Sequence, residues 1–128
     1  MRCINIYMKK VYHLGNCTTC QAIIKETGID KKGFYMQEIK TEKVTASQLD
    51  EMKKMAGSYE ALFSRRAIKY KEMGLKDKDL TEKDYRKLIL EEYTFLKRPV
   101  LIAGKKIFIG NAPTVVKEAK TFLDSLKR

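Results

Sequence analysis

Hydrophobic and polar positions in the first third of the chain follow a pattern that predicts strand, helix and strand. Residues 9–14 and 34–39 are short runs rich in β-forming side chains, which is typical of strands. Between them, from Cys17 onward, apolar residues recur at helical spacing until Gly28, a residue that favours a helix end. A strand, a helix and a strand over about 30 residues have the length of a βαβ unit with parallel strands.

The middle of the chain has a helical pattern. Thr45 opens the sequence TASQ, which fits a capping box, and apolar residues follow at helical spacing until Gly57. Residues 58–75 predict one or two short helices, and Thr81 is placed to cap a further helix. The sequence therefore predicts a helical region over about residues 45–94.

The last third of the chain returns to strands and ends in a helix. Residues 100–102 and 107–109 are apolar and strand-like, joined by a link of hairpin length, and residues 113–128 are helical. The order β-α-β, helices, β-β-α predicts an α/β protein with a thioredoxin-like fold and a mixed sheet. Its two parts, about residues 9–42 and 97–128, are separated by the helical insertion.

We expect residues 1–128 to form one domain, because this length supports one core but not comfortably two. The first residues have two interpretations. Met8 is itself a possible start, which would make the preceding residues an extension that contains Cys3. Alternatively, the alternation of Ile4 and Ile6 extends the first strand.

The chain is strongly basic, with a net charge of +11 from 27 basic and 16 acidic residues. Such a charge attracts anions, among them nucleic acids, small oxyanions and acidic proteins. The lysines are spread over every segment, and no zinc-finger, RNP or basic-zipper signature accompanies them. We therefore expect no direct binding of nucleic acid.

The sequence also predicts a cytoplasmic protein with no membrane partner. No apolar run reaches the roughly 20 residues of a membrane-spanning helix, and the N-terminal residues lack the pattern of a secretory signal. Disulfides in the cytoplasm are usually transient and serve catalysis or sensing. Three cysteines are also too few for a disulfide framework, and odd in number.

Two of the cysteines, Cys17 and Cys20, stand where the first predicted strand meets the helix. A helix N-terminus favours the thiolate, because its unpaired N–H groups and dipole stabilise negative charge. Cys17 is therefore predicted to be the nucleophile, and Cys20, one turn inside, to resolve the adduct as a disulfide. A C-x-x-C motif on a βαβ pattern indicates redox chemistry.

Two alternatives remain open for this pair. A structural zinc site needs four ligands, usually as two spaced pairs, and the only further candidates are Cys3 and His13. We therefore expect no metal. The two cysteines can also be inert buried thiols, as free cysteines often are.

One histidine and two arginines are further candidates for the site. His13, four residues before Cys17, either assists ionisation or proton donation, or merely fills the strand end. Thioredoxin-like folds place a proline, often cis, at a strand start beside the redox cysteines. Pro99 stands at the equivalent strand start here, so in such a fold Arg98 would face the site. Guanidinium groups bind oxyanions bidentately. Outside such a fold, Arg98 and Arg66 are solvated surface residues.

Four stretches of the chain resemble the ArsC arsenate reductase family, together with its Spx and YffB relatives. The resemblance covers essentially residues 9–128 and implies a thioredoxin-like fold with a helical insertion. The stretches are YHLGNCTTC (12–20), ALFSRRAIKYKEMGL (61–75), LTEKDYRKLILEEYTFLKRPVLI (80–102) and the IFIGN that follows the hairpin.

The resemblance implies roles for individual residues. Cys17 matches the nucleophilic cysteine of the family, and His13 matches a histidine at the same distance before it. Arg98 matches the arginine of an R-P motif that contacts the oxyanion in the arsenate reductases. Arg66 matches an arginine of the Spx and YffB groups, with Arg65 as the alternative. No bound cofactor is implied; the reductant would be glutathione with glutaredoxin, or thioredoxin.

Two departures separate the chain from the glutaredoxin-dependent arsenate reductases. Those enzymes usually carry serine where this chain has Cys20, whereas C-x-x-C is the Spx-like arrangement that forms a regulatory disulfide. They also carry an arginine near the position of Gly110. We therefore predict a thiol-dependent oxidoreductase for an oxyanion or disulfide substrate. The alternative is a Spx-like redox regulator that binds the C-terminal domain of the RNA polymerase α subunit.

Overall fold

The computed structural model describes residues 9–125, which fall into two compact units. The sheet unit comprises the described residues up to Glu42 and from Arg98 onward, and the helical unit comprises Lys43–Lys97. The two interpretations of the first residues, including Cys3, concern positions outside the described range.

The sheet unit contains four strands in the order β2-β1-β3-β4. Strand β1 pairs in parallel with β2 and antiparallel with β3, and β3 pairs antiparallel with β4. This mixed sheet confirms the predicted fold. Its elements are β1 (Lys9–His13), α1 (Thr18–Thr27), the 3-10 turn η1 (Ile29–Lys31), β2 (Tyr35–Glu38), β3 (Val100–Ala103), β4 (Lys106–Ile109) and α5 (Pro113–Ser125).

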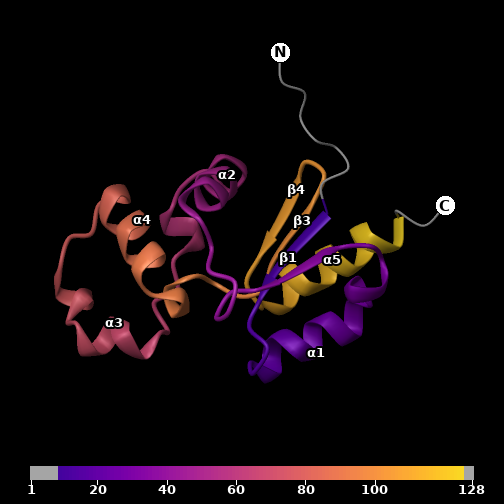
Figure 1. The fold of residues 1–128 in the computed structure, drawn as a ribbon, viewed down its shortest axis with the longest axis horizontal. Helices are drawn as coiled ribbons and strands as arrows, with labels where there is room; N and C mark the ends of the chain where they lie inside the picture. Colours follow the sequence, from indigo (N-terminus) through magenta and orange to yellow (C-terminus); the bar gives the residue numbers. More distant parts are fainter. Residues whose placement is uncertain (1–8, 126–128) are drawn as a thin grey trace, which may run out of the picture. The chain divides into compact units, whose positions relative to one another are not determined.

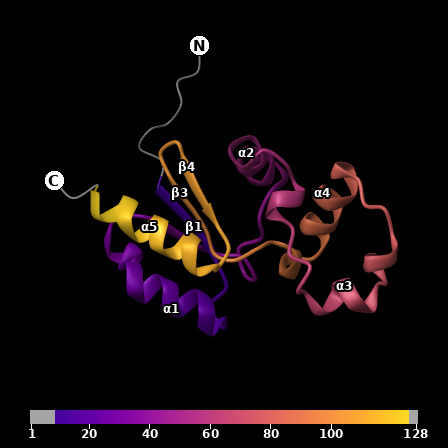
Figure 2. The same cartoon turned by 180° about the vertical axis from the view of Figure 1, so that it is seen from behind.

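Helices α1 and α5 lie on the same side of the sheet (Figures 1 and 2). Apolar side chains from the strands and from both helices meet there, so burial of this face holds the unit together. Gly28 ends α1 in a left-handed conformation at φ 65°, and its N–H donates to the Ile24 carbonyl. The buried cluster consists of Val11, Ile24, Ile29, Phe34, Leu101, Ala103, Ala119 and Leu123.

The helical unit contains short helices, as the sequence pattern predicts. Capping boxes begin both longer helices: Thr45 pairs with Gln48, and Thr81 pairs with Asp84. The segment predicted to hold one or two short helices forms one α-helix and two 3-10 turns. The elements are α2 (Ala46–Ala56), η2 (Glu60–Leu62), α3 (Ile68–Glu72), η3 (Leu75–Asp77), α4 (Glu82–Glu91) and η4 (Tyr93–Phe95).

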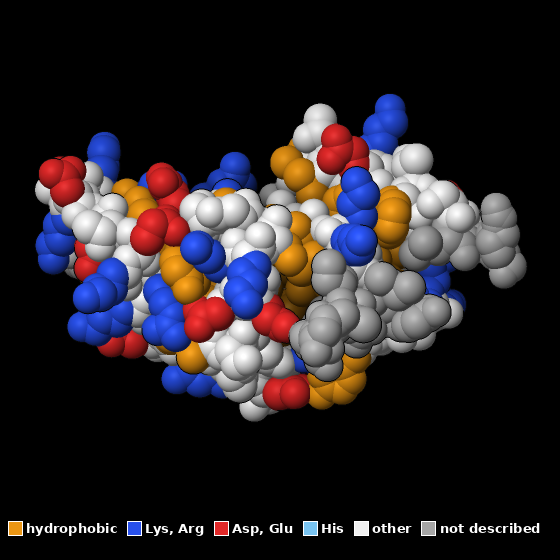
Figure 3. All heavy atoms as spheres, turned by 90° about the horizontal axis from the view of Figure 1, so that it is seen from above, with side chains coloured by type: hydrophobic (Ala, Val, Ile, Leu, Met, Phe, Trp, Pro, Cys, Tyr) orange, Lys and Arg blue, Asp and Glu red, His pale blue; other side chains and the backbone are white. Residues whose placement is uncertain are grey.

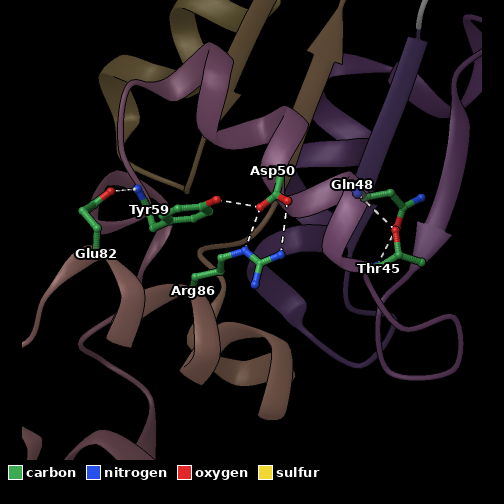
Figure 4. A network of polar contacts seen from close by, with 6 residues as sticks. All are labelled: Thr45, Gln48, Asp50, Tyr59, Glu82 and Arg86. Atoms are coloured by element: carbon green, nitrogen blue, oxygen red, sulfur yellow. Dashed lines mark hydrogen bonds and ion pairs between the residues drawn. The ribbon is translucent and has the colours of Figure 1, made fainter.

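A polar network joins α2 to α4 within the helical unit (Figure 4). The Arg86 guanidinium donates to both carboxylate oxygens of Asp50, at 2.8 and 3.2 Å. The Tyr59 hydroxyl donates to the same carboxylate at 2.6 Å. Glu82 accepts the backbone N–H groups of Tyr59 and Glu60. The loop after α2 is therefore tied to both helices.

Candidate redox site

Cys17 occupies the N-cap of α1, where the chain leaves β1 and turns into the helix. Its backbone is extended, and its Sγ accepts a hydrogen bond from the backbone N–H of Cys20 at 3.4 Å. Its own N–H donates to the Leu14 carbonyl at 3.1 Å, which closes the turn before the helix. An N-cap side chain serves as an acceptor for free N–H groups, and a thiolate is a stronger acceptor than a thiol.

The pKa of Cys17 lies below the ordinary value of a cysteine thiol. Burial opposes ionisation, but three groups outweigh it: the Cys20 backbone N–H, the Cys20 side chain, and the charged, hydrogen-bonding Arg98 guanidinium. Cys17 is also partly accessible. A partly exposed cysteine with a lowered pKa has the properties of a nucleophile.

Cys20 has the opposite environment. Its side chain is fully buried, and burial raises its pKa to about 11, with the neighbouring Cys17 as a further cause. Cys20 therefore remains a thiol near neutral pH and supplies a hydrogen bond to the Cys17 thiolate. The two cysteines thus differ in the way that attack by one and resolution by the other requires.

His13 ends β1 and lies half-buried beside the loop that leads to Cys17. Burial lowers the pKa of His13, and the negative charge of Glu38 partly offsets that effect. The Gln21 amide lies 3.5 Å from Nδ1 of the ring. The positive charge that lowers the pKa of the nearby Cys17 is that of the Arg98 guanidinium.

Arg98 and Pro99 precede β3 and are joined by a cis peptide bond. The structure thus places Arg98 with Cys17 in the sheet unit, where its guanidinium acts on the Cys17 sulfur. The Pro99 carbonyl accepts the N–H of Gly110 at 2.9 Å. Gly110 has φ 87°, a conformation that other residues rarely adopt, so the backbone here favours glycine.

The remaining arginine candidates belong to the helical unit. Arg65 forms an ion pair with Glu60 at 2.8 Å and donates to the Tyr85 hydroxyl at 2.9 Å. Arg66 is exposed, and its backbone N–H donates to the Ser64 hydroxyl. Arg65 thus has structural contacts within its own unit, whereas the Arg66 side chain extends into solvent.

Two residues that the sequence interpretation missed surround the loop before Cys17. The Gln21 amide donates to the Leu14 carbonyl at 3.2 Å. Glu38 accepts the N–H of Gly15 at 2.7 Å, a bond that holds the pKa of that carboxyl below its usual value. Gln21 lies one helical turn after Cys17, and this spacing could have indicated that its side chain lies near the loop before Cys17. The contact of Glu38 depends on the parallel pairing of β1 with β2.

No metal-binding cluster is found among residues 9–125, and the one face drawn in Figure 3 shows no concentrated basic patch. Within residues 9–125, no three His, Cys, Asp or Glu side chains are grouped to hold a metal ion. On the face drawn in Figure 3, lysine and arginine side chains are scattered among acidic and uncharged ones. None of the helices in the described range is long and apolar enough to cross a membrane.

Known proteins share this fold along most of its length. An arsenate reductase from Vibrio cholerae matches with a TM-score of 0.71 and 17% identity, over 88% of this chain and 98% of that protein. A Staphylococcus aureus protein determined by NMR matches with a TM-score of 0.68 and 28% identity, over 87% and 97%. The likeness covers both units of the chain.

Comparison of sequences also relates this chain to known proteins along most of its length. The Escherichia coli K12 protein YfgD, which is uncharacterized, is 25% identical over 112 residues, or 85% of this chain and 93% of that protein. The family profile of ArsC matches residues 12–119, a range that includes the cysteine pair and Arg98-Pro99. With its thioredoxin-like sheet unit and a profile match over most of its length, this chain belongs to the ArsC family.

Proposed function

We propose that this protein is a thiol-dependent reductase of the arsenate reductase type, with Cys17 as its nucleophile and an oxyanion or disulfide as its substrate. The observation that carries the proposal is the contrast between the two cysteines. Cys17 caps α1 with a lowered pKa, while Cys20 is buried beside it with a raised pKa. Arsenate is the first substrate to test, because a structural relative is named an arsenate reductase.

The reaction on arsenate needs two thiols. The Cys17 thiolate attacks arsenic(V), an S–As bond forms, and one oxygen leaves as water after protonation. A second thiol, Cys20 in this proposal, then attacks Cys17 Sγ. The S–As bond breaks, and its electron pair stays on arsenic, which leaves as arsenite. Two thiols are thereby oxidised to one disulfide while arsenic is reduced from the (V) to the (III) state.

Arg98 is proposed to contact the anion as well as the thiolate. A guanidinium offers several N–H donors in a plane and suits the oxygens of an oxyanion. His13 is proposed to assist proton movement near Cys17. Pro99 is proposed to determine the course of the backbone at Arg98. Arg66 is a further candidate for contact with the anion. The variants Arg98→Ala and Arg66→Ala would show which of the two arginines binds it.

Each turnover leaves a Cys17–Cys20 disulfide, whose reduction takes two external thiols, from two glutathione molecules or from one dithiol protein. Thiol–disulfide exchange with glutaredoxin and glutathione, or with thioredoxin, would return both cysteines to the thiol form. Comparison of these reductants in the same assay identifies the partner.

The decisive experiment is an arsenate reduction assay with each reductant, on wild type and on Cys17→Ser and Cys20→Ser variants. We expect Cys17→Ser to abolish turnover. Cys20→Ser should stop turnover with thioredoxin, but it should still form the Cys17 adduct. Cys3→Ser is the matched control and should retain full activity. Arsenite formation in Cys17→Ser would contradict the role of Cys17, and no reduction of arsenate or of a disulfide by wild type would refute the proposed activity.

The regulatory alternative rests on the same pair of cysteines. Because the side chains of Cys17 and Cys20 are hydrogen-bonded to each other, an oxidant is expected to produce their disulfide without a bound substrate. A Spx-like regulator would bind the C-terminal domain of the RNA polymerase α subunit in one redox state. A binding assay with that domain, using reduced and oxidised protein, separates the candidates: no binding in either state would eliminate the regulator.

A further inference from the structure

Gln21 reaches back from α1 to the loop that precedes Cys17. Its Nε2 lies 3.2 Å from the Leu14 carbonyl oxygen and 3.5 Å from His13 Nδ1. One amide group therefore contacts both the backbone of the loop and the imidazole ring. His13 is the only histidine in the chain, so any signal from an imidazole belongs to it.

The two contacts determine the orientation of the Gln21 amide. A carbonyl oxygen can only accept a hydrogen bond, so the end of the amide that faces Leu14 must be its NH2 group. An NH2 group only donates. A hydrogen bond from the same NH2 group to His13 Nδ1 requires an Nδ1 without a proton, which leaves the single proton of the neutral ring on Nε2.

A second residue opposes this arrangement electrostatically. Glu38 is the register partner of His13 across the parallel β1–β2 pair, and its negative charge favours the imidazolium form. Its carboxylate oxygens accept hydrogen bonds from the N–H groups of Gly15, Lys40 and Thr41. Burial of the ring lowers the pKa of His13. In addition, an Nδ1–H of a charged ring would face the Gln21 NH2 group, which is another donor.

We propose that Gln21 is a positioning residue that holds His13 as a neutral imidazole with its proton on Nε2. In this state His13 offers a hydrogen-bond donor at Nε2 and no positive charge, so the cation that acts on Cys17 is Arg98. The inference refines the proposed function, since it specifies what His13 contributes to the thiol chemistry. It concerns a protonation state, however, and can be tested without turnover.

The test is nitrogen-15 NMR of the imidazole across a pH series, on the reduced full chain. Wild type should show the Nε2–H tautomer of the neutral ring at pH 7.5. Gln21→Leu removes the donor and should yield a mixture of tautomers with a higher pKa of His13. Gln21→Glu replaces the donor with a charged acceptor, which should move the proton to Nδ1 and raise that pKa by about 1.

Ala22→Glu is the matched control, because it adds the same charge at the next, exposed position of α1. It should leave the tautomer unchanged and shift the pKa less than Gln21→Glu does. An Nδ1–H tautomer or an imidazolium in wild type at pH 7.5 would overturn the proposal. So would equal responses in the two charged variants. If wild type shows the Nε2–H ring but reduces no substrate, the positioning role of Gln21 is supported and the proposed function fails.

Discussion

At the scale of single residues, the reactivity of the site depends on which cysteine is ionised. The backbone N–H of Cys20 and the Arg98 guanidinium favour the Cys17 thiolate, whereas burial keeps Cys20 protonated. The difference follows from position, since one sulfur caps the helix and the other points into the core. The same local sequence, CTTC, thus contains two thiols of unequal reactivity.

This difference can be measured from the pH dependence of alkylation by iodoacetamide. In a Cys3→Ser background, Cys20→Ser leaves only Cys17, whose alkylation rate should reach half its maximum below pH 9. Cys17→Ser leaves only Cys20, which should react slowly and ionise above its ordinary pKa, because its burial remains. The prediction is wrong if the two profiles have the same midpoint.

A second prediction concerns Arg98. The Arg98→Ala variant should raise the pKa of Cys17 and slow its alkylation at pH 7 roughly tenfold, because one charge-assisted hydrogen bond of about 1.5 kcal/mol is lost. Arg98→Lys retains the positive charge and should slow the alkylation of Cys17 less than Arg98→Ala does. The matched control is Arg66→Ala, in the helical unit, whose alkylation rate should equal that of wild type. Unchanged kinetics in Arg98→Ala would contradict the role given to this arginine.

At the scale of elements, the contact of α2 with α4 includes an ionic network. Hydrogen bonds from Arg86 and then Tyr59 lower the pKa of Asp50 to about 2, from an ordinary value of 3.8. A carboxyl whose pKa falls on folding stabilises the folded state above its unfolded-state pKa. That contribution disappears as the pH falls through the folded-state pKa.

The prediction is a pH-dependent difference between wild type and Asp50→Asn in the free energy of unfolding by urea. The difference should be constant above about pH 5 and should shrink between pH 4 and pH 2. Because the pair is partly exposed, high salt should also reduce it. Glu51→Gln, the next position on α2, is the control. A difference that stays constant down to pH 2 would exclude the ionised Asp50 as its source.

The starts of the helices were the features of the structure that the sequence predicted best. The capping residues Thr45 and Thr81 mark helix starts by local chemistry alone, and both capping boxes are present. The contacts of Gln21 and Glu38 were not predictable in this way. They depend on the course of the loop between β1 and α1 and on strand register, which no local pattern encodes.

At the scale of the whole molecule, the sheet unit depends on a core formed by distant parts of the chain. Leu101 of β3 is 4% exposed and packs in the cluster with residues of β1, α1 and α5. Leu101→Ala should therefore reduce the free energy of unfolding by about 2–4 kcal/mol, measured with urea and circular dichroism. Ile68→Ala, at a position that is 75% exposed, should change it little. Equal losses in the two variants would contradict the placement of this core.

The order of the chain has a consequence for how the protein acquires reactivity. Arg98 is synthesised about 80 residues after Cys17, at roughly 5–20 residues per second, and β3 follows it. Until β3 has joined β1, the growing polypeptide lacks the Arg98 guanidinium, which is one of the groups that lower the pKa of Cys17 in the folded sheet unit. Pairing of β3 with β1 is therefore the folding step that brings the Arg98 contribution to Cys17. Part of the thiolate character of Cys17 thus depends on a strand that is translated last among the strands that contact β1.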